Sequence, residues 1–190
     1  MKPGSVLVAS VLWLSPSIGQ VQDPLFDEAR VIHYPVQGTS LRELRRDLEL
    51  KGPRDAAGKR VQGLTTWKIE WTFDVVETEG ACEITRVQVD LTATVTLPQW
   101  TPGNGAPDAL VDAWRRYETA LRRHEARHYR HGVMATEQIR ALADSASKGP
   151  CRTVGQAFDA KASRILQMHA SLSQLYDVRT RHGATEGVVL

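Results

Sequence analysis

The sequence lacks a strong net charge, any internal repeat, any low-complexity tract and any long linker. Its 24 basic and 22 acidic side chains give a net charge of +2 over 190 residues. Binding to nucleic acid or to an anionic membrane surface usually needs a strong positive field, so we expect neither partner. With 42% hydrophobic and 24% charged residues, the composition is that of one ordinary globular domain.

Long apolar stretches are also missing. The longest apolar run, from Val6 to Leu14, is much shorter than the ~20 residues that a membrane-spanning helix needs. Lys2 precedes this run and small residues up to Gly19 follow it, an order typical of a secretory signal peptide. We therefore expect residues 1–19 to be a cleaved signal peptide. Residues 20–190 should then form a single domain without a membrane span, located in the periplasm or secreted.

Cysteine is scarce, because Cys82 and Cys151 are the only two in the chain. An even count in an exported protein predicts one disulfide bond between them. A bridge over this separation should stabilise the fold by about 4 kcal/mol in the chain-entropy estimate.

Alternating side chains predict a β-rich first half of the domain. Residues 67–75 and 87–97 each place apolar side chains on one face and polar side chains on the other. The polar segment 77–80 suits a turn, so these two strands should form an antiparallel hairpin. Residues 31–34 predict another short strand, and residues 98–107, rich in Pro and Gly, predict a loop.

Helical patterns dominate the second half, after one short helix in the first. A capping box at residues 40–43 starts this short helix, and Gly52 ends it. A long helix begins at Asp108, a further helix covers about residues 153–176, and residues 183–190 read as a loose tail. The inward positions of the further helix should include Phe158, Ile165, Leu172 and Leu175. These elements predict an α+β fold with an antiparallel sheet, a long active-site helix and a second C-terminal helix.

His124, Glu125 and His128 carry the clearest chemical signal. They lie on one stripe of the long helix, together with Leu110, Trp114, Tyr117, Leu121, His131 and Ala135. Histidines four residues apart share a helix face and can bind one zinc ion at about 2.0–2.1 Å. Glu125 can then take a proton from a zinc-bound water as that water attacks a carbonyl, and return it to the leaving amine. This HExxH pattern predicts a zinc metallopeptidase.

A catalytic zinc usually has a third protein ligand, and the sequence offers three candidates. His131 is the nearest, but it lies about 10 Å along the helix axis from His124. We therefore expect it beside the site rather than on the ion. The C-terminal motif offers His182 as the ligand, while Asp177 could bind instead or could orient a ligand histidine. Tyr176 could donate a hydrogen bond to the developing oxyanion.

Motifs along most of the chain carry a resemblance to a known family. They are Tyr34, Gly38-Thr39, Gly52-Pro53, Trp67 to Trp71, Cys82, Leu97-Pro98-Gln99-Trp100, Trp114, Tyr117, His124-Glu125-x-x-His128 and Tyr176-Asp177-x-x-Thr180-x-His182-Gly183. With these motifs the sequence resembles a bacterial family of predicted secreted zinc-dependent proteases, a domain-of-unknown-function family with an HExxH motif. The resemblance implies that His124 and His128 bind zinc, that Glu125 is the base, and that His182 belongs to the site.

The sequence thus predicts an exported zinc metallopeptidase that hydrolyses peptide bonds in a peptide or protein substrate. The alternative is a non-catalytic, zinc-stabilised periplasmic envelope or binding protein. Glu125 favours the enzyme, because a structural zinc ion has no use for a base at that position.

Overall fold

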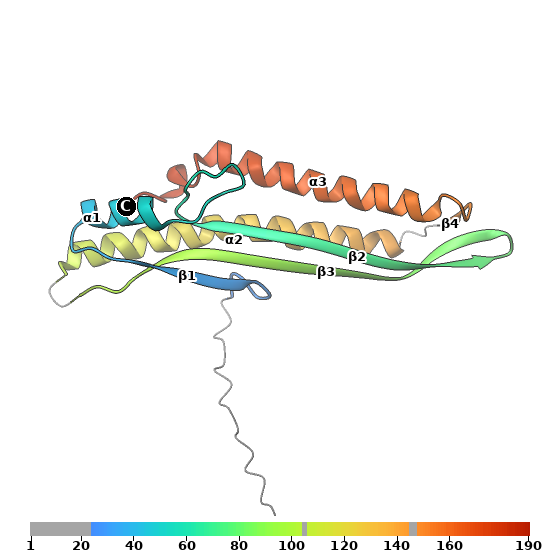
Figure 1. Ribbon diagram of the computed structural model, residues 1–190, viewed down its shortest axis with the longest axis horizontal. Coiled ribbons are helices and arrows are strands. Elements are labelled where there is room, and N and C mark those ends of the chain that lie inside the picture. The colour runs from blue at the N-terminus through green and yellow to red at the C-terminus, as the bar shows by residue number, and fades with distance from the viewer. Residues whose placement is uncertain (1–23, 104–105, 145–147) are drawn as a thin grey trace, which may run out of the picture.

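A computed structural model describes residues 24–103, 106–144 and 148–190, so the expected signal peptide lies outside the described residues. The elements are β1 (Arg30–Val36), α1 (Leu41–Lys51), β2 (Leu64–Thr78), β3 (Ala81–Trp100), α2 (Asp108–Asp144), β4 (Lys148–Gly149), α3 (Val154–Thr180) and the 3-10 turn η1 (Ala184–Glu186). They confirm the predicted α+β class (Figure 1). Within these described segments, no helix is long and apolar enough to span a bilayer.

The sheet is mixed rather than purely antiparallel. Its strand order is β1-β3-β2, and β4 pairs with the beginning of β3. β2 and β3 form the predicted antiparallel hairpin, whereas β1 runs parallel to β3, with Arg30 opposite Thr94 and Val36 opposite Trp100. Alternation along a sequence shows which side chains face inward but not the direction of the neighbouring strand. The parallel pairing was therefore not predictable from the pattern.

A β-bulge at Arg86 interrupts the alternation predicted for β3. Arg86 has a φ of 49°, and the register between β2 and β3 shifts at this point. Before the bulge Cys82 and Ile84 face the core, and after it the inward positions are the odd-numbered ones from Val89 to Leu97. The extra residue therefore keeps the tip of the hairpin facing the same core as the rest of the strand.

β3 continues to Trp100, although the sequence predicted a loop from Pro98. Proline has no N–H to donate to a neighbouring strand. Pairing with β2 ends at Thr96, however, so only β1 borders β3 at Pro98. The indole N–H of Trp100 donates to the carbonyl of Gly38 at 3.1 Å, which ties the end of the strand to the loop before α1.

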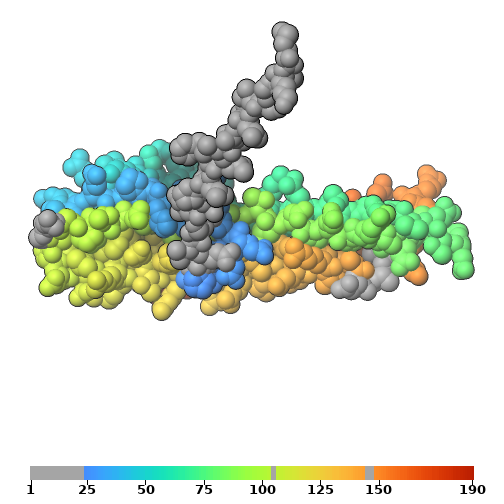
Figure 2. Space-filling model, turned by 90° about the horizontal axis from the view of Figure 1, so that it is seen from below, coloured from blue at the N-terminus to red at the C-terminus, as the bar shows by residue number. Residues whose placement is uncertain are grey.

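α2 runs along the sheet and carries the predicted buried stripe. Figure 2 shows the strands and α2 lying side by side over the length of the molecule. The first half of α2 packs into a core with α1 and β3 around Tyr117, and the second half packs under the hairpin around Ile139. The helix continues through Gly132, where a Cβ atom would lie 2.9 Å from Cγ of Trp67. Glycine at this position permits the close approach of α2 to β2.

α3 extends four residues beyond its predicted end, to Thr180, and its inward side also differs from the prediction. Phe158 is buried as expected, but Leu172 and Leu175 are 41% and 40% exposed. The prediction for these two leucines was wrong. The last turns of α3 direct the polar side chain of Asp177 toward α2 instead, and the leucines consequently point outward.

The tail after Gly183 is packed rather than loose, which corrects the prediction. Val188 and Leu190 are 7% and 8% exposed and belong to the same core as α1 and the first half of α2. The guanidinium of Arg45 in α1 donates to the main-chain oxygen of Leu190. These few apolar side chains fix the tail without any periodic pattern that the sequence could reveal.

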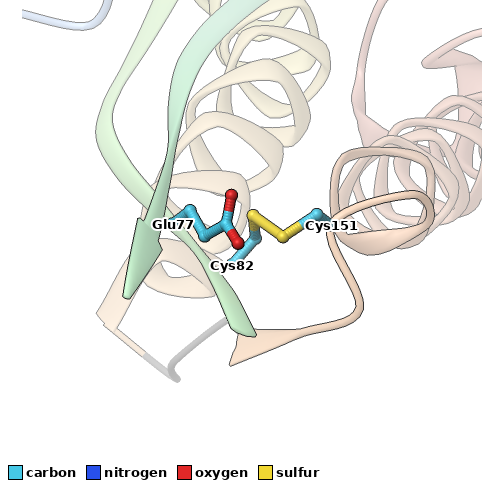
Figure 3. Close-up of side chains that lie close together, drawn as sticks. All are labelled: Glu77, Cys82 and Cys151. Carbon is cyan, nitrogen blue, oxygen red and sulfur yellow. A yellow bond between two sulfur atoms is a disulfide. The ribbon is translucent and has the colours of Figure 1, made fainter. Parts of the chain in front are cut away.

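Cys82 and Cys151 form the predicted disulfide bond, with an S–S distance of 2.08 Å (Figure 3). The bond joins the start of β3 to the segment before α3 across a separation of 69 residues. Glu77 lies beside it, but both sulfur atoms are in the bridge and neither is a free thiolate that could bind a metal. The bridge therefore fastens the beginning of α3 to the tip of the hairpin.

Replacing both Cys82 and Cys151 by serine should lower the free energy of unfolding by about 4 kcal/mol, because the unfolded chain gains the entropy of the opened loop. Urea unfolding of the two proteins measures the difference. A variant that keeps its stability would contradict the stabilising role of the bridge.

Candidate metal centre

Two successive turns of α2 and the last turn of α3 direct three donor atoms to one point. Nε2 of His124 lies 3.2 Å from Nε2 of His128. Oδ1 of Asp177 lies 3.1 Å from the first of these nitrogens and 3.2 Å from the second. Two ligands at ~2.0–2.1 Å from a tetrahedral zinc ion are about 3.3–3.4 Å apart. The three donors therefore fit a zinc ion with little adjustment, and they could hold a metal ion together.

Each histidine ring is oriented through its other nitrogen. Nδ1 of His124 lies 3.1 Å from Oε2 of Glu186, and Nδ1 of His128 lies 2.8 Å from Oγ of Ser173. When Nδ1 carries the proton and donates it to these oxygens, the lone pair of Nε2 points to the shared position. Metal-binding histidines are commonly supported in this way.

Neither Ser173 nor Glu186 was predicted from the sequence. Ser173 precedes Asp177 by four residues and therefore lies on the same face of α3, a spacing that could have identified it. Glu186 lies in the tail, where no periodic pattern predicts a position. Only the packing of that tail places its carboxylate beside His124.

Tyr176 supports the centre from the side. Its ring stacks on the ring of His124 with centroids 4.9 Å apart, and its hydroxyl donates to Glu186 at 2.5 Å. Burial, followed by the hydrogen bond and negative charge of Glu186, raises the pKa of Tyr176. The hydroxyl of Tyr176, which the sequence suggested as a donor to an oxyanion, thus donates to Glu186 in this structure.

Glu125 lies next to the donors without being one of them. It is 3% exposed, and its Oε2 accepts a hydrogen bond from the hydroxyl of Thr65 at 2.8 Å. Gly63 leaves room for this carboxylate, because a Cβ atom there would lie 2.6 Å from Oε1 of Glu125. Burial raises the pKa of Glu125, although the charge of His128 and the bond from Thr65 oppose that effect. A fixed carboxylate is therefore available beside the shared position.

Electrostatics at the centre favour a positive charge. Burial acts to raise the pKa of Asp177, but its hydrogen bonds with His124 and His128 outweigh burial and hold that pKa well below its usual range. Burial lowers the pKa of His124, while its bonds with Asp177 and Glu186 raise it by more. Together these carboxylates attract either a protonated imidazole or a cation to the shared position.

His182 lies at the edge of the centre, and His131 lies outside it. Nδ1 of His182 is 3.4 Å from Oδ1 of Asp177, and the His182 side chain is 52% exposed. It is not one of the three residues whose donor atoms all lie within 4.8 Å of one another. Zinc binding by His182 stays a prediction, while the donor spacing favours Asp177. His131 instead contacts His169 of α3, with 3.4 Å between their Nδ1 atoms.

The donors open into a pocket of about 350 Å³. His124, Glu125 and His128 line it together with the loop before β2 on one side and the end of α3 on the other. This loop and the last turns of α3 lie beside one another in Figure 1. Catalytic zinc sites keep an open position of this kind, whereas structural zinc sites are closed by four protein ligands.

The chain belongs to the family described as "Bacterial protein of unknown function (DUF922)", whose sequence model matches residues 31–183. The matched segment contains His124, Glu125, His128 and Asp177 and ends before Glu186. No curated protein and no solved structure matches the chain. The bacterial family is thereby confirmed, and its description names neither an activity nor a metal.

For a zinc ion held by His124, His128 and Asp177, the geometry predicts a graded loss of affinity in variants of the surrounding residues. Asp177→Ala removes a donor and should weaken binding by more than ~100-fold, while Glu186→Gln and Ser173→Ala should each weaken it by about 10–100-fold. His182→Ala should have a smaller effect than Asp177→Ala. Competition with a chelating dye measures these affinities, with His33→Ala on the exposed side of β1 as the control. A larger loss in His182→Ala would make His182 the third ligand instead.

Proposed function

We propose that this protein is a zinc-dependent peptidase that acts outside the cytoplasm. One observation carries the proposal: His124, His128 and Asp177 direct their donors to one point, and Glu125 lies buried beside them at an open pocket. Two histidines and one carboxylate form the ligand set of several catalytic zinc sites. A buried carboxylate next to such a set, but outside it, is the feature that hydrolysis requires.

The residues would divide the work in a simple way. His124, His128 and Asp177 would hold the ion. A zinc ion there would act as a Lewis acid, polarising the substrate carbonyl and lowering the pKa of water that binds to it. Glu125 would accept the proton of the attacking water and deliver it to the leaving amine, so that the amide becomes a carboxylate and an amine. Thr65 would keep the Glu125 carboxylate in one orientation during both transfers.

Export is part of the same proposal. The disulfide between Cys82 and Cys151 suits an oxidising compartment such as the periplasm or the extracellular medium. The order of residues 1–19 also suits a signal peptide.

A non-catalytic zinc-stabilised protein is the second candidate. An ion held by His124, His128 and Asp177 would join α2 to the end of α3 and would stabilise the fold for that reason alone. The open pocket and the position of Glu125 support the peptidase, because neither contributes to a structural site.

Glu125→Gln tests the proposal directly. The variant should bind zinc as tightly as the wild-type protein, because Glu125 is not a donor. Its rate of peptide hydrolysis should fall by about 10²–10⁴-fold, the size of a typical general-base contribution. The measurements are metal analysis of the purified proteins and kcat/KM on a peptide that the wild type cleaves.

Glu137→Gln is the matched control, since Glu137 is an exposed glutamate on the same helix. It should leave both zinc content and hydrolysis unchanged. Equal hydrolysis by the wild type and Glu125→Gln would favour the non-catalytic candidate. Wild-type protein that contains no zinc after purification without chelators would refute both.

A further inference from the structure

Basic side chains from two segments of the chain line the pocket. Lys59 and Arg60 belong to the loop before β2, and Arg181 directly follows α3. Asp55 is the only acidic side chain among the lining residues besides Glu125 and Asp177, which lie at the metal centre. The whole chain has a net charge of only +2, so this cluster does not reflect a generally basic protein.

The carboxylate of Asp55 already accepts hydrogen bonds from its own loop. Oδ1 of Asp55 accepts the backbone N–H groups of Ala57 and Lys59 at 3.0 and 2.8 Å. These bonds hold the turn that presents the Lys59 side chain to the pocket. Arg60 donates from Nη1 to the carbonyl of Gly52 at 2.7 Å, which fixes its guanidinium to the same loop.

Lys59, Arg60 and Arg181 have no acidic partner within the part of the chain that the structure describes. Among the described residues, neither Lys59, Arg60 nor Arg181 forms an ion pair. Some basic side chains elsewhere are paired, as Lys51 is with Asp47 at 2.7 Å. Lys59 and Arg181 therefore bring positive charge to the pocket, and a substrate carboxylate could form ion pairs with them.

The carboxylates of the metal centre do not cancel this charge. Glu125 is 3% exposed and accepts a hydrogen bond from Thr65, so its carboxylate is buried at the bottom of the pocket. Asp177 faces the imidazole rings of His124 and His128. The negative charge of Asp177 therefore acts mainly on these two rings, and less on Lys59 and Arg181.

We infer that Lys59 and Arg181 form a carboxylate-binding subsite, and that the protein selects peptides with a carboxylate close to the bond that is cleaved. This inference rests on the proposed peptidase function and adds a substrate class to it. A guanidinium suits the two oxygens of a carboxylate, and the opposing lysine adds a second positive charge. The carboxylate is supplied by an acidic side chain or by the free C-terminus of the peptide, and the same subsite accepts either.

Binding tests the subsite without any need for catalysis. The probes are four hexapeptides that carry an uncharged boron-dipyrromethene dye, bound to zinc-loaded Glu125→Gln protein and followed by fluorescence anisotropy. One is neutral with an amidated end, one has a glutamate and an amidated end, one is neutral with a free C-terminus, and one has a lysine and an amidated end. We expect at least one carboxylate peptide to bind about tenfold more tightly than the neutral one, the size expected for one charge-assisted hydrogen bond.

Charge reversal identifies the residues responsible. In the same background, Lys59→Glu/Arg181→Glu should remove the preference for carboxylate peptides. Lys161→Glu/Arg164→Glu changes the net charge by the same amount at exposed positions of α3 that do not line the pocket, and it should keep the preference. Arg60 stays unchanged because it supports the loop. Circular dichroism confirms that both variants are folded.

Cleavage then links the subsite to hydrolysis. Wild-type protein is incubated with a chymotryptic digest of a bacterial extract, and mass spectrometry locates the new cleavage sites. Sites with an acidic residue or a free C-terminus within a few positions should be enriched, mainly through a lower KM, and the pocket double variant should lose the enrichment.

The outcomes separate the two ideas. Equal binding of all four probes, or a preference that survives Lys59→Glu/Arg181→Glu, overturns the subsite even when peptides are cleaved. Selective binding of carboxylate peptides without any cleavage supports the subsite and refutes the peptidase. Cleavage without enrichment of carboxylates supports the peptidase and overturns the inferred selectivity.

Discussion

Two unprotonated imidazole nitrogens 3.2 Å apart repel each other unless positive charge lies between them, and the centre of this protein is arranged around that constraint. Glu186 and Ser173 restrain the far nitrogens of the two rings, so the rings cannot turn away. Asp177 adds a negative oxygen at nearly the same distance from both. The fold thus brings together three donors that could hold a metal ion.

Holding this arrangement requires α3 to be placed accurately against α2. The disulfide fixes the first end of α3 to the hairpin, and the packed tail fixes the other end to the core around α1. α2 itself is buried along the sheet, with Gly132 allowing close contact to Trp67. The position of α3 against α2, which brings the donors together, is therefore fixed at both ends of α3.

Much of this could be predicted from periodicity and spacing. The stripe of α2 predicted a long helix with His124 and His128 on its buried face, and the even cysteine count predicted the disulfide. Other features depend on long-range packing, which local patterns do not encode. The direction of β1, the bulge at Arg86 and the outward-facing Leu172 belong to this group.

The third donor illustrates the same difference within one motif. His182 and Asp177 are five residues apart, and both side chains suit zinc. Because α3 continues to Thr180, Asp177 lies within the helix and faces α2, while His182 follows the helix in a left-handed conformation at the edge of the site. The last turn of α3 thus places Asp177, rather than His182, beside His124 and His128.

The tail has a thermodynamic consequence that reaches beyond packing. Glu186 orients His124 only while Val188 and Leu190 stay docked in the core. Binding free energies are reciprocal, so an ion that favours the oriented His124 also favours the docked tail by the same amount. Binding of an ion at the centre and docking of the C-terminal segment would therefore be coupled through the carboxylate of Glu186.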